Sequence, residues 1–252
     1  RKPENLINSK SIGAKEGKNM KIVDLSQKIF FGAPNFPEHF PTIIFPFTTH
    51  EETAQRMKEG YSYQANGMII HEHGTTHVDS HSHIDTDPEA QSIEEIPLED
   101  FVTRGVCIDV SDVEPRTFVT KEKIQKELDN MDETIEEGDT VIFYSGNWEN
   151  NFPDQEYITD HPGLNREAAQ WLADKGVVNI GIDAPTPDNP DIAEEGHYPV
   201  HLVCRDEKMM NMENLGIPEE VANETFRFVG LPLKIKGGTG SPIRAVAIFE
   251  DE

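Results

Sequence analysis

Five histidines lie within thirteen residues of one another and share that stretch with a carboxylate. The histidines are His71, His73, His77, His81 and His83, and the carboxylate is Asp79. Imidazole and carboxylate side chains are the usual ligands of zinc and related divalent ions, so the cluster predicts a metal site. The structural alternatives are a solvated polar loop, or histidines in a core that each have their own hydrogen-bond partners. A purification tag is disfavoured because the cluster is internal and follows a strand-like run.

The spacing of the first two candidate ligands requires a bend in the chain. On a straight strand, His73 and His77 would stand roughly 13 Å apart at about 3.3 Å per residue. Metal–nitrogen bonds measure only about 2.1 Å. We therefore expect the chain to curl at 74–76, so that His73 and His77 lie on a turn with Asp79 following. His83 can then approach from the side without being a ligand.

A second group of candidate ligands lies far along the chain. His197 and His201 are spaced i, i+4, and Glu213 stands twelve residues after His201. A glutamate at that distance from a histidine is commonplace. This group therefore indicates a metal site only when it is taken together with the first cluster.

The elements that position these residues are mostly strands. Short runs rich in β-branched and aromatic residues predict strands over 22–25, 43–48, 67–70, 106–110, 141–144, 177–182, 227–233 and 243–249. Helices are predicted over 121–131, capped by Thr120, and over 166–175, between Asn165 and Gly176, with a weaker candidate over 51–58. We therefore expect an α/β fold, in the sense of mixed α and β, with a β core.

Loops between these elements carry two further signals. Proline-rich loops over 34–41 and 185–190 are long enough to be functional walls or lids. The glycine cluster 237–240 lacks the GK[ST] ending of a phosphate-binding loop and lies between two strand candidates. It predicts a hairpin turn.

Composition narrows the class of protein. The 252 residues include 47 acidic and 22 basic side chains, giving a formal net charge of −25, with a mean hydropathy of −0.57. Such a surface repels phosphate backbones and anionic lipids, so we expect neither nucleic-acid nor membrane partners, and no apolar run could span a membrane. Two distant cysteines, with no recognisable secretory signal, favour the reducing cytoplasm. We interpret 1–19 as a flexible N-terminal extension or cloning remnant and 20–252 as a single domain.

The histidine cluster resembles a family signature. The segment HGTTHVDSHSH, from His73 to His83, is similar to the HxGTHxDxPxH motif of the cyclase family of metal-dependent hydrolases, which includes bacterial kynurenine formamidase and isatin hydrolase. His201 with Glu213-Asn214-Leu215 resembles the second motif of that family. Further similarity extends over most of 20–250, at 22–26, 144–148, 181–185, 231–235 and 240–244. The chain departs from the signature at His81, where the family has proline, and Gly74 stands one position early.

The resemblance implies a set of roles for individual residues. The implied metal ligands are His73, His77, Asp79, His201 and Glu213, with Asp79 able to bridge two ions. His83 would be the acid/base histidine, and Phe36 would contact the substrate, where a kynurenine formamidase has tryptophan. The resemblance further implies one or two divalent ions per chain, most simply zinc or manganese, a compact β-barrel-like core flanked by helices, and a homo-oligomer, either dimer or tetramer. It assigns no role to His71, His81 or His197.

The function expected from these observations is hydrolysis. We expect a divalent-metal-dependent enzyme that cleaves a carbon–nitrogen amide-type bond, other than a peptide bond, in a small cyclic or aromatic substrate by metal-activated water. The alternatives are kynurenine formamidase itself, a metal-dependent cyclase or lyase, and, from another class, a non-catalytic metal-binding protein. Storage of metal needs neither a base nor a substrate wall, so His83 and Phe36 favour catalysis.

Overall fold

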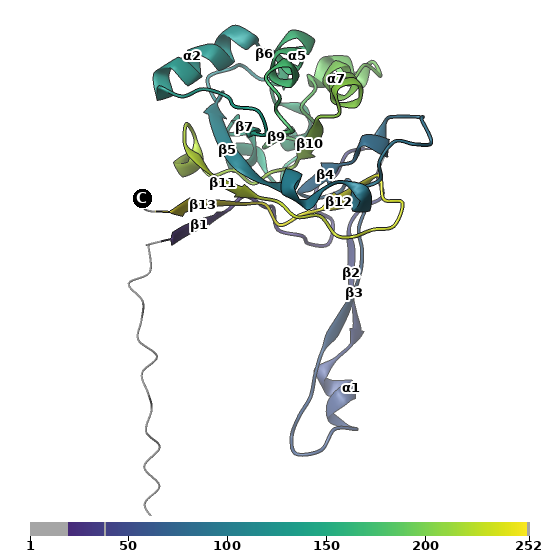
Figure 1. Ribbon diagram of the computed structural model, residues 1–252. Coiled ribbons are helices and arrows are strands. Elements are labelled where there is room, and N and C mark those ends of the chain that lie inside the picture. The colour runs from purple at the N-terminus through teal and green to yellow at the C-terminus, as the bar shows by residue number, and fades with distance from the viewer. Residues whose placement is uncertain (1–19, 38, 251–252) are drawn as a thin grey trace, which may run out of the picture.

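The computed structural model describes residues 20–37 and 39–250, so the extension expected over 1–19 lies outside the described residues. Within them, nine strands form one curled sheet, and the longer helices cover one of its faces (Figure 1). The expected mixed α and β class with a β core is confirmed. None of the described helices is long and apolar enough to cross a membrane.

The large sheet combines a parallel centre with antiparallel edges. In spatial order its strands are β1 (Met20–Asp24), β13 (Val246–Glu250), β11 (Thr225–Val229), β5 (Val102–Asp109), β7 (Thr140–Tyr144), β9 (Asn179–Ile182), β10 (Met210–Glu213), β4 (His77–Asp79) and β12 (Gly240–Pro242). Strands β5, β7, β9 and β10 run parallel, and the remaining pairs are antiparallel.

Helices and short strands fill the connections. The helices over the sheet are α2 (Lys121–Met131), α5 (Arg166–Asp174) and α7 (Pro199–Glu207). The shorter elements are α3 (Asn147–Asn151), α4 (Glu156–Thr159), α6 (Pro190–Glu194), the 3₁₀ helices η1 (His81–His83), η2 (Ile93–Glu95), η3 (Leu98–Phe101) and η4 (Glu219–Val221), and the paired strands β6 (Phe118–Val119) and β8 (Gly163–Leu164).

The alternation of side chains along the central strands builds two apolar layers. Val106 and Ile108 of β5 belong to the cluster that packs against Ile124 and Leu172 of the helices, whereas Cys107 belongs to a second cluster on the opposite face of the sheet. Successive residues of a strand point to opposite faces, so a strand buried on both faces is apolar throughout. The metal-site candidates lie near one edge of this doubly covered sheet.

The two stronger helix predictions are confirmed together with their caps. Thr120 accepts a hydrogen bond from the backbone of Lys123, and Asn165 accepts one from Ala168. Gly176 follows α5 with a φ of +82°, a backbone conformation that glycine adopts without the penalty other residues incur. The third candidate, over 51–58, is shorter than expected: α1 covers only His50–Ala54, and a turn follows it.

Several elements near the histidine cluster differ from the prediction. His77 and Asp79 lie on strand β4, and only 74–76 form the expected curl. Strand β10 was not predicted because it is short and carries polar residues at buried positions. Helix α7 was not predicted because its N-cap residue, Tyr198, is not a capping residue type. The predicted hairpin turn over 237–240 is wrong in part. Gly240 begins β12, which pairs with β4, and only the preceding residues form the turn.

A long hairpin projects from the body of the molecule. Strands β2 (Ile43–Thr48) and β3 (Ala65–Ile69) pair with each other outside the large sheet and carry α1 near the tip (Figure 1). We call residues 43–69 the arm. Its first strand follows the predicted wall loop 34–41, and its second strand leads directly to His71 and His73.

Candidate metal centre

The candidate ligands come together from four separate segments. His73 lies on the turn before β4, His77 and Asp79 lie on β4, His201 lies on α7 and Glu213 lies on β10. Strands β10 and β4 are antiparallel neighbours, and Glu213 stands directly opposite His77 in their register. Directly opposed residues direct their side chains to the same face, so the pairing itself brings this glutamate to the histidine.

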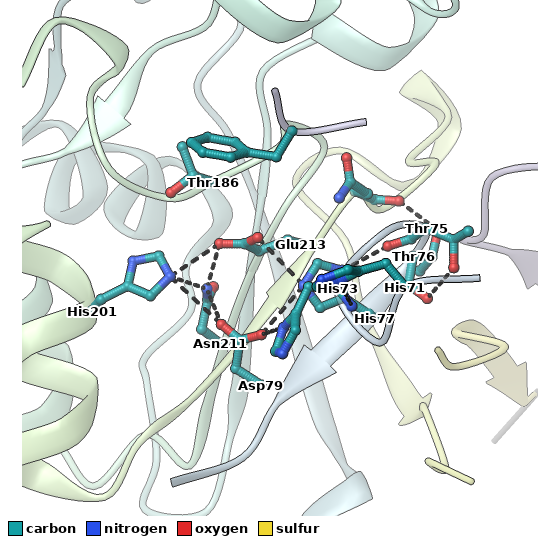
Figure 2. A network of polar contacts seen from close by, with 12 residues as sticks. His71, His73, Thr75, Thr76, His77, Asp79, Thr186, His201, Asn211 and Glu213 are labelled. Carbon is teal, nitrogen blue, oxygen red and sulfur yellow. Dashed lines mark hydrogen bonds and ion pairs between the residues drawn. The ribbon is translucent and has the colours of Figure 1, made fainter. Parts of the chain in front are cut away.

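Asp79 occupies the centre of the cluster (Figure 2). Its Oδ1 lies 2.7 Å from Nδ1 of His73 and 3.2 Å from Nε2 of His77. Its Oδ2 lies 3.5 Å from Nε2 of His201. Both oxygens therefore face imidazole nitrogens, as a carboxylate shared between two cation positions would.

Glu213 closes the other side of the cluster. Its Oε2 is 3.4 Å from Nε2 of His77, and its Oε1 is 3.3 Å from Nε2 of His201. Nδ2 of Asn211 donates to Glu213 at 2.8 Å and to Asp79 at 3.2 Å. Asn211 thus fixes the separation of the two carboxylates.

Contacts at Nδ1 of His77 and of His201 determine which ring nitrogen faces the cluster. Nδ1 of His77 lies 2.6 Å from the carbonyl oxygen of Thr75, which can only accept, so Nδ1 is the donor. Nδ1 of His201 lies 2.6 Å from Oδ2 of Asp188, and Oδ1 of Asp188 accepts from the backbone of Val200. Such contacts orient a ligand imidazole and leave its Nε2 free for a metal ion.

The donor set fits a divalent cation. Nε2 of His77 is fully buried and has no hydrogen-bond partner within the described residues, although two carboxylates lie close by. The ligand atoms of His77, Asp79 and Glu213 all lie within 4.8 Å of one another, and so do those of His73, Asp79 and His83. The two groups share Asp79, which is the arrangement a pair of ions would use.

The electrostatics of the cluster show how strongly its charges interact. Burial alone lowers the pKa of His77, but contacts with Asp79 and Glu213 outweigh burial and raise that pKa to about 10. Burial and the neighbouring Asp79 charge favour neutral Glu213, yet His201 and His77 hold its pKa at about 2. Positive charge in this cluster is therefore stabilised, and a metal ion would replace the proton on each imidazole.

His83 lies beside the cluster on η1. Its ring stacks on that of His73, with centroids 4.0 Å apart, and lies 6.1 Å from the ring of His201. Burial lowers the pKa of His83, which favours the neutral imidazole. The ring is thus placed to accept a proton inside the site.

A cavity of about 250 Å³ opens above the cluster. His73, His83, His201 and Glu213 reach it from the ligand side, and Phe36, His39, Ile84, Pro185, Thr186 and Tyr198 form the rest of its lining. The structure therefore brings Phe36 to the cavity that holds the candidate ligands. Both proline-rich loops contribute to its walls.

Strand β12 and the residue before it lie against the ring of His73. Nε2 of His73 lies 3.0 Å from the hydroxyl of Thr239, which also bonds Glu72. A Cβ atom at Gly240 would lie 2.5 Å from Cε1 of His73, so only glycine allows β12 to pass beneath that ring. Gly240, the last residue of the glycine cluster, therefore leaves room for the ring of His73.

The remaining histidines of the cluster occupy different surroundings. His71 stacks on His39 with ring centroids 3.9 Å apart, and its Nδ1 accepts from the backbone of His73. His81 borders a small cavity of about 20 Å³ behind the site, next to Cys204. His197 belongs to neither of the two candidate ligand groups found among the described residues.

Sequence reasoning missed several residues that shape the centre: Asp188, Asn211, His39, Thr186, Tyr198 and Thr239. Of these residues, Asn211 could have been recognised from its position in the sequence. Asn211 stands two residues before Glu213, so on a strand both side chains point to the same face. Asp188 is thirteen residues from His201, and only the folded chain brings them together.

Fold and cluster together define a mixed α/β protein with a buried histidine–carboxylate centre suited to divalent cations. The model of the Cyclase family matches residues 23–189. The chain belongs to this cyclase family of metal-dependent hydrolases.

Similar proteins cover most of the chain. Kynurenine formamidase from Salinibacter ruber is 29% identical over 194 residues, which cover 77% of this chain and 84% of that protein. Kynurenine formamidase from Erythrobacter litoralis is 29% identical over 228 residues, covering 90% and 93%. The fold is similar to that of an isatin hydrolase bound to the product analogue thioisatinate, with a TM-score of 0.80 and 20% identity over 92% of this chain and 93% of the other.

Proposed function

We propose that this chain is a divalent-metal-dependent hydrolase that cleaves a carbon–nitrogen amide-type bond in a small aromatic or cyclic substrate. The observation that carries the proposal is the buried Nε2 of His77, which has no hydrogen bond among the described residues and lies 3.2 Å from Asp79 and 3.4 Å from Glu213. Glu213 in turn lines a cavity with aromatic walls. The similar formamidases make an N-formyl aromatic amide the first substrate to test, and the isatin hydrolase makes an aromatic lactam the second.

The proposed ligands are the five residues that converge on Asp79. His77, Asp79 and Glu213 would hold one ion, with His201 beside them, and His73 would join Asp79 at a second position. Zinc and manganese both suit imidazole and carboxylate donors. When bound, such an ion lowers the pKa of water and polarises a carbonyl group.

The protein's own groups supply the remaining chemistry. Neutral His83 accepts the proton of the attacking water and passes it to the leaving nitrogen, because its ring stacks on His73 and lines the cavity. The rings of Phe36 and Tyr198 hold the flat substrate by aromatic contacts and exclude water. Asp188 and the carbonyl of Thr75 keep the ligand rings in place throughout the reaction.

The buried state of the cysteines supports a reducing compartment for this enzyme. Cys107 and Cys204 are both free and buried, and burial raises the pKa of the Cys204 thiol to about 12. Neither cysteine therefore competes for the metal, and the cytoplasm is the proposed location.

The test is reconstitution followed by a small substrate panel. Protein stripped of metal is loaded with zinc or manganese and assayed with N-formyl anilines, isatin-like lactams and cyclic imides. We expect hydrolysis of at least one class, dependent on the added metal. Fully loaded protein that hydrolyses none of the three would refute the proposal and favour a metal-binding protein without catalysis.

A further inference from the structure

The backbone pairing between β10 and β4 ends at two of the proposed ligands. Only two residue pairs join these strands, Met212 with Val78 and Glu213 with His77. Asn214, the next residue of the chain, has a φ of +56°, which is a left-handed conformation that no strand can continue. Contacts other than the strand pairing must therefore hold the two segments together beyond Glu213 and His77.

A closed network of hydrogen bonds takes the place of the next backbone pair. Oγ1 of Thr76 donates to the carbonyl oxygen of Asn214 at 2.5 Å and accepts from the backbone of Gln27 at 2.9 Å. Nε2 of Gln27 donates to the hydroxyl of Tyr157 at 2.5 Å, and that hydroxyl donates to Oδ1 of Asn214 at 2.9 Å. Each hydroxyl has a single donor hydrogen, and both of these hydrogens are used. We call these four residues the Tyr157 network.

The body of the protein fixes the hydroxyl of Tyr157. The side chain is fully buried, and Nδ2 of Asn147 donates to the backbone carbonyl of Tyr157 at 2.9 Å. The ring of Phe152 packs against that of Tyr157 edge to face, with centroids 5.2 Å apart. Thr76 and Asn214 are buried as well, so water competes little for the hydrogen bonds of the network. The hydroxyl is therefore a fixed point to which the two segments can be joined.

We infer that Tyr157 is a positioning residue for the metal centre, because its network sets the separation of the segments that carry His77 and Glu213. Thr76 directly precedes His77, and Asn214 directly follows Glu213, so the network joins the immediate neighbours of both proposed ligands. Nε2 of His77 lies 3.4 Å from Oε2 of Glu213 at this junction. The inference rests on the proposed function in one respect, since it takes His77 and Glu213 to be metal ligands.

A metal ion makes this separation critical. Bonds from a divalent ion such as zinc to imidazole and carboxylate ligands are all about 2.0–2.2 Å long. A shift of a few tenths of an ångström between the two segments would therefore weaken at least one of these bonds. Tyr157 does not line the cavity that Phe36 and His83 share, so it should affect metal binding and leave contacts with the substrate unchanged.

The test removes single hydroxyl groups from the network. Tyr157→Phe keeps the buried ring, and Thr76→Val keeps the shape of the side chain but loses the hydrogen bond to Asn214. The matched control is Tyr144→Phe, because Tyr144 is also buried and its hydroxyl donates to Glu149 at 2.8 Å, outside the network. Competition with a chelator measures the affinity for zinc and for manganese, and chemical denaturation of the metal-free proteins measures their stability.

We expect Tyr157→Phe and Thr76→Val to bind metal about tenfold more weakly than wild type, at the lower end of the losses typical of groups that orient metal ligands. Tyr144→Phe should lose a similar amount of stability but bind metal as wild type does. At saturating metal, the KM of both network variants should equal that of wild type, because neither residue lines the cavity.

Wild-type metal affinity in either folded network variant overturns the inference, as does an equal loss of affinity in Tyr144→Phe. If one network variant does not fold, Gln27→Ala replaces it, since it removes only the amide that is bonded to Tyr157. A wild type that binds no divalent ion overturns the inference together with the metal centre. Metal binding without hydrolysis of any substrate refutes the proposed function alone, because the affinities of the variants can still be compared.

Discussion

Two sides of one cavity are built in different ways. The ligand side is carried by β4, β10 and α7, where Asp79, Glu213 and His201 are buried and backed by further hydrogen bonds. The opposite wall belongs to a loop, where Phe36 and His39 are half-buried and held by ring contacts with one another and with His71. Under the proposed function, the reacting groups lie in the rigid body of the protein, whereas the substrate would contact a loop next to the arm.

The ligand side should be the more sensitive of the two to substitution. We expect Asp79→Ala to abolish activity and to remove the metal, because Asp79 contacts three of the candidate ligand imidazoles and belongs to both ligand groups. The measurement is metal content by elemental analysis alongside turnover, with Asp85→Ala as control, because the half-buried Asp85 pairs with Lys208 and belongs to neither ligand group. Full metal occupancy with normal turnover would show that the cluster is not the reactive centre.

His83→Ala should separate proton transfer from metal binding. We expect the rate to fall by about 10²- to 10⁴-fold with the metal retained, since a proton-transferring group is needed only while protons move. His81→Ala is the matched control, because it lies on the same 3₁₀ helix but outside the lining of the cavity that Phe36 and His83 share. If His83→Ala instead loses metal, His83 is a ligand with His73 and Asp79, and the ligand side is larger than proposed.

Asp188→Asn should weaken metal binding, although Asp188 is not itself a candidate ligand. Oδ2 of Asp188 holds Nδ1 of His201, and loss of its charge should lower metal affinity by about 10- to 100-fold. Competition with a chelator measures that affinity. The control is Asp191→Asn, three residues further on and exposed to solvent. Equal affinities for both variants would mean that the backing of His201 is unimportant.

The histidine cluster was predictable because it is local in sequence. His73, His77 and Asp79 stand close enough together to be recognised as ligands whatever the fold around them. The strand that carries two of them was not predicted, because three residues that include a histidine and an aspartate lack the composition of a strand. Pairing with β10 and β12 on either side is what makes His77–Asp79 extended.

Features that depend on tertiary contacts could not be predicted from the sequence. The β-branched and aromatic residues over 43–48 indicated a strand correctly, but nothing local distinguishes a strand of the sheet from one that projects as an arm. The role of Asp188 likewise arises only when α7 places His201 beside it. Sequence reasoning therefore identified the residues that the fold brings together as candidate ligands and the loop that lines the cavity, but not the contacts that hold them in place.

Asp183 is a further buried carboxylate, but unlike Asp79, Glu213 and Asp188 it has no histidine among its hydrogen-bond or ion-pair partners in the described residues. Burial raises the pKa of Asp183 to about 6, and its contacts among the described residues include hydrogen bonds from Ser145. Since the folded pKa lies above the ordinary value of 3.8, the stability contributed by the neutral acid is present below about pH 4 and is lost as pH rises through 6.

The variant Asp183→Asn has no carboxyl group at this position, so it should lack the pH-dependent loss of stability that Asp183 causes. Relative to the variant, we expect wild type to lose about 1–3 kcal/mol of unfolding free energy between pH 4 and pH 7. Chemical denaturation of both proteins at a series of pH values gives the difference, in which the titration of other groups cancels. Parallel stability curves for the two proteins would show that Asp183 titrates normally.

The smallest effect is expected on the opposite wall, at Phe36. A lost aromatic contact of about 0.5–1.5 kcal/mol should raise KM roughly 2- to 12-fold in Phe36→Ala, with metal content and melting temperature nearly unchanged. If Phe36 instead filled a core beneath the loop, its truncation would destabilise the protein by about 3–5 kcal/mol. Its half-buried ring and its place in the cavity lining favour the first outcome. Phe36→Trp restores a ring and should recover most of the affinity, so thermal unfolding and steady-state kinetics on both variants decide whether the wall selects the substrate or only supports the loop.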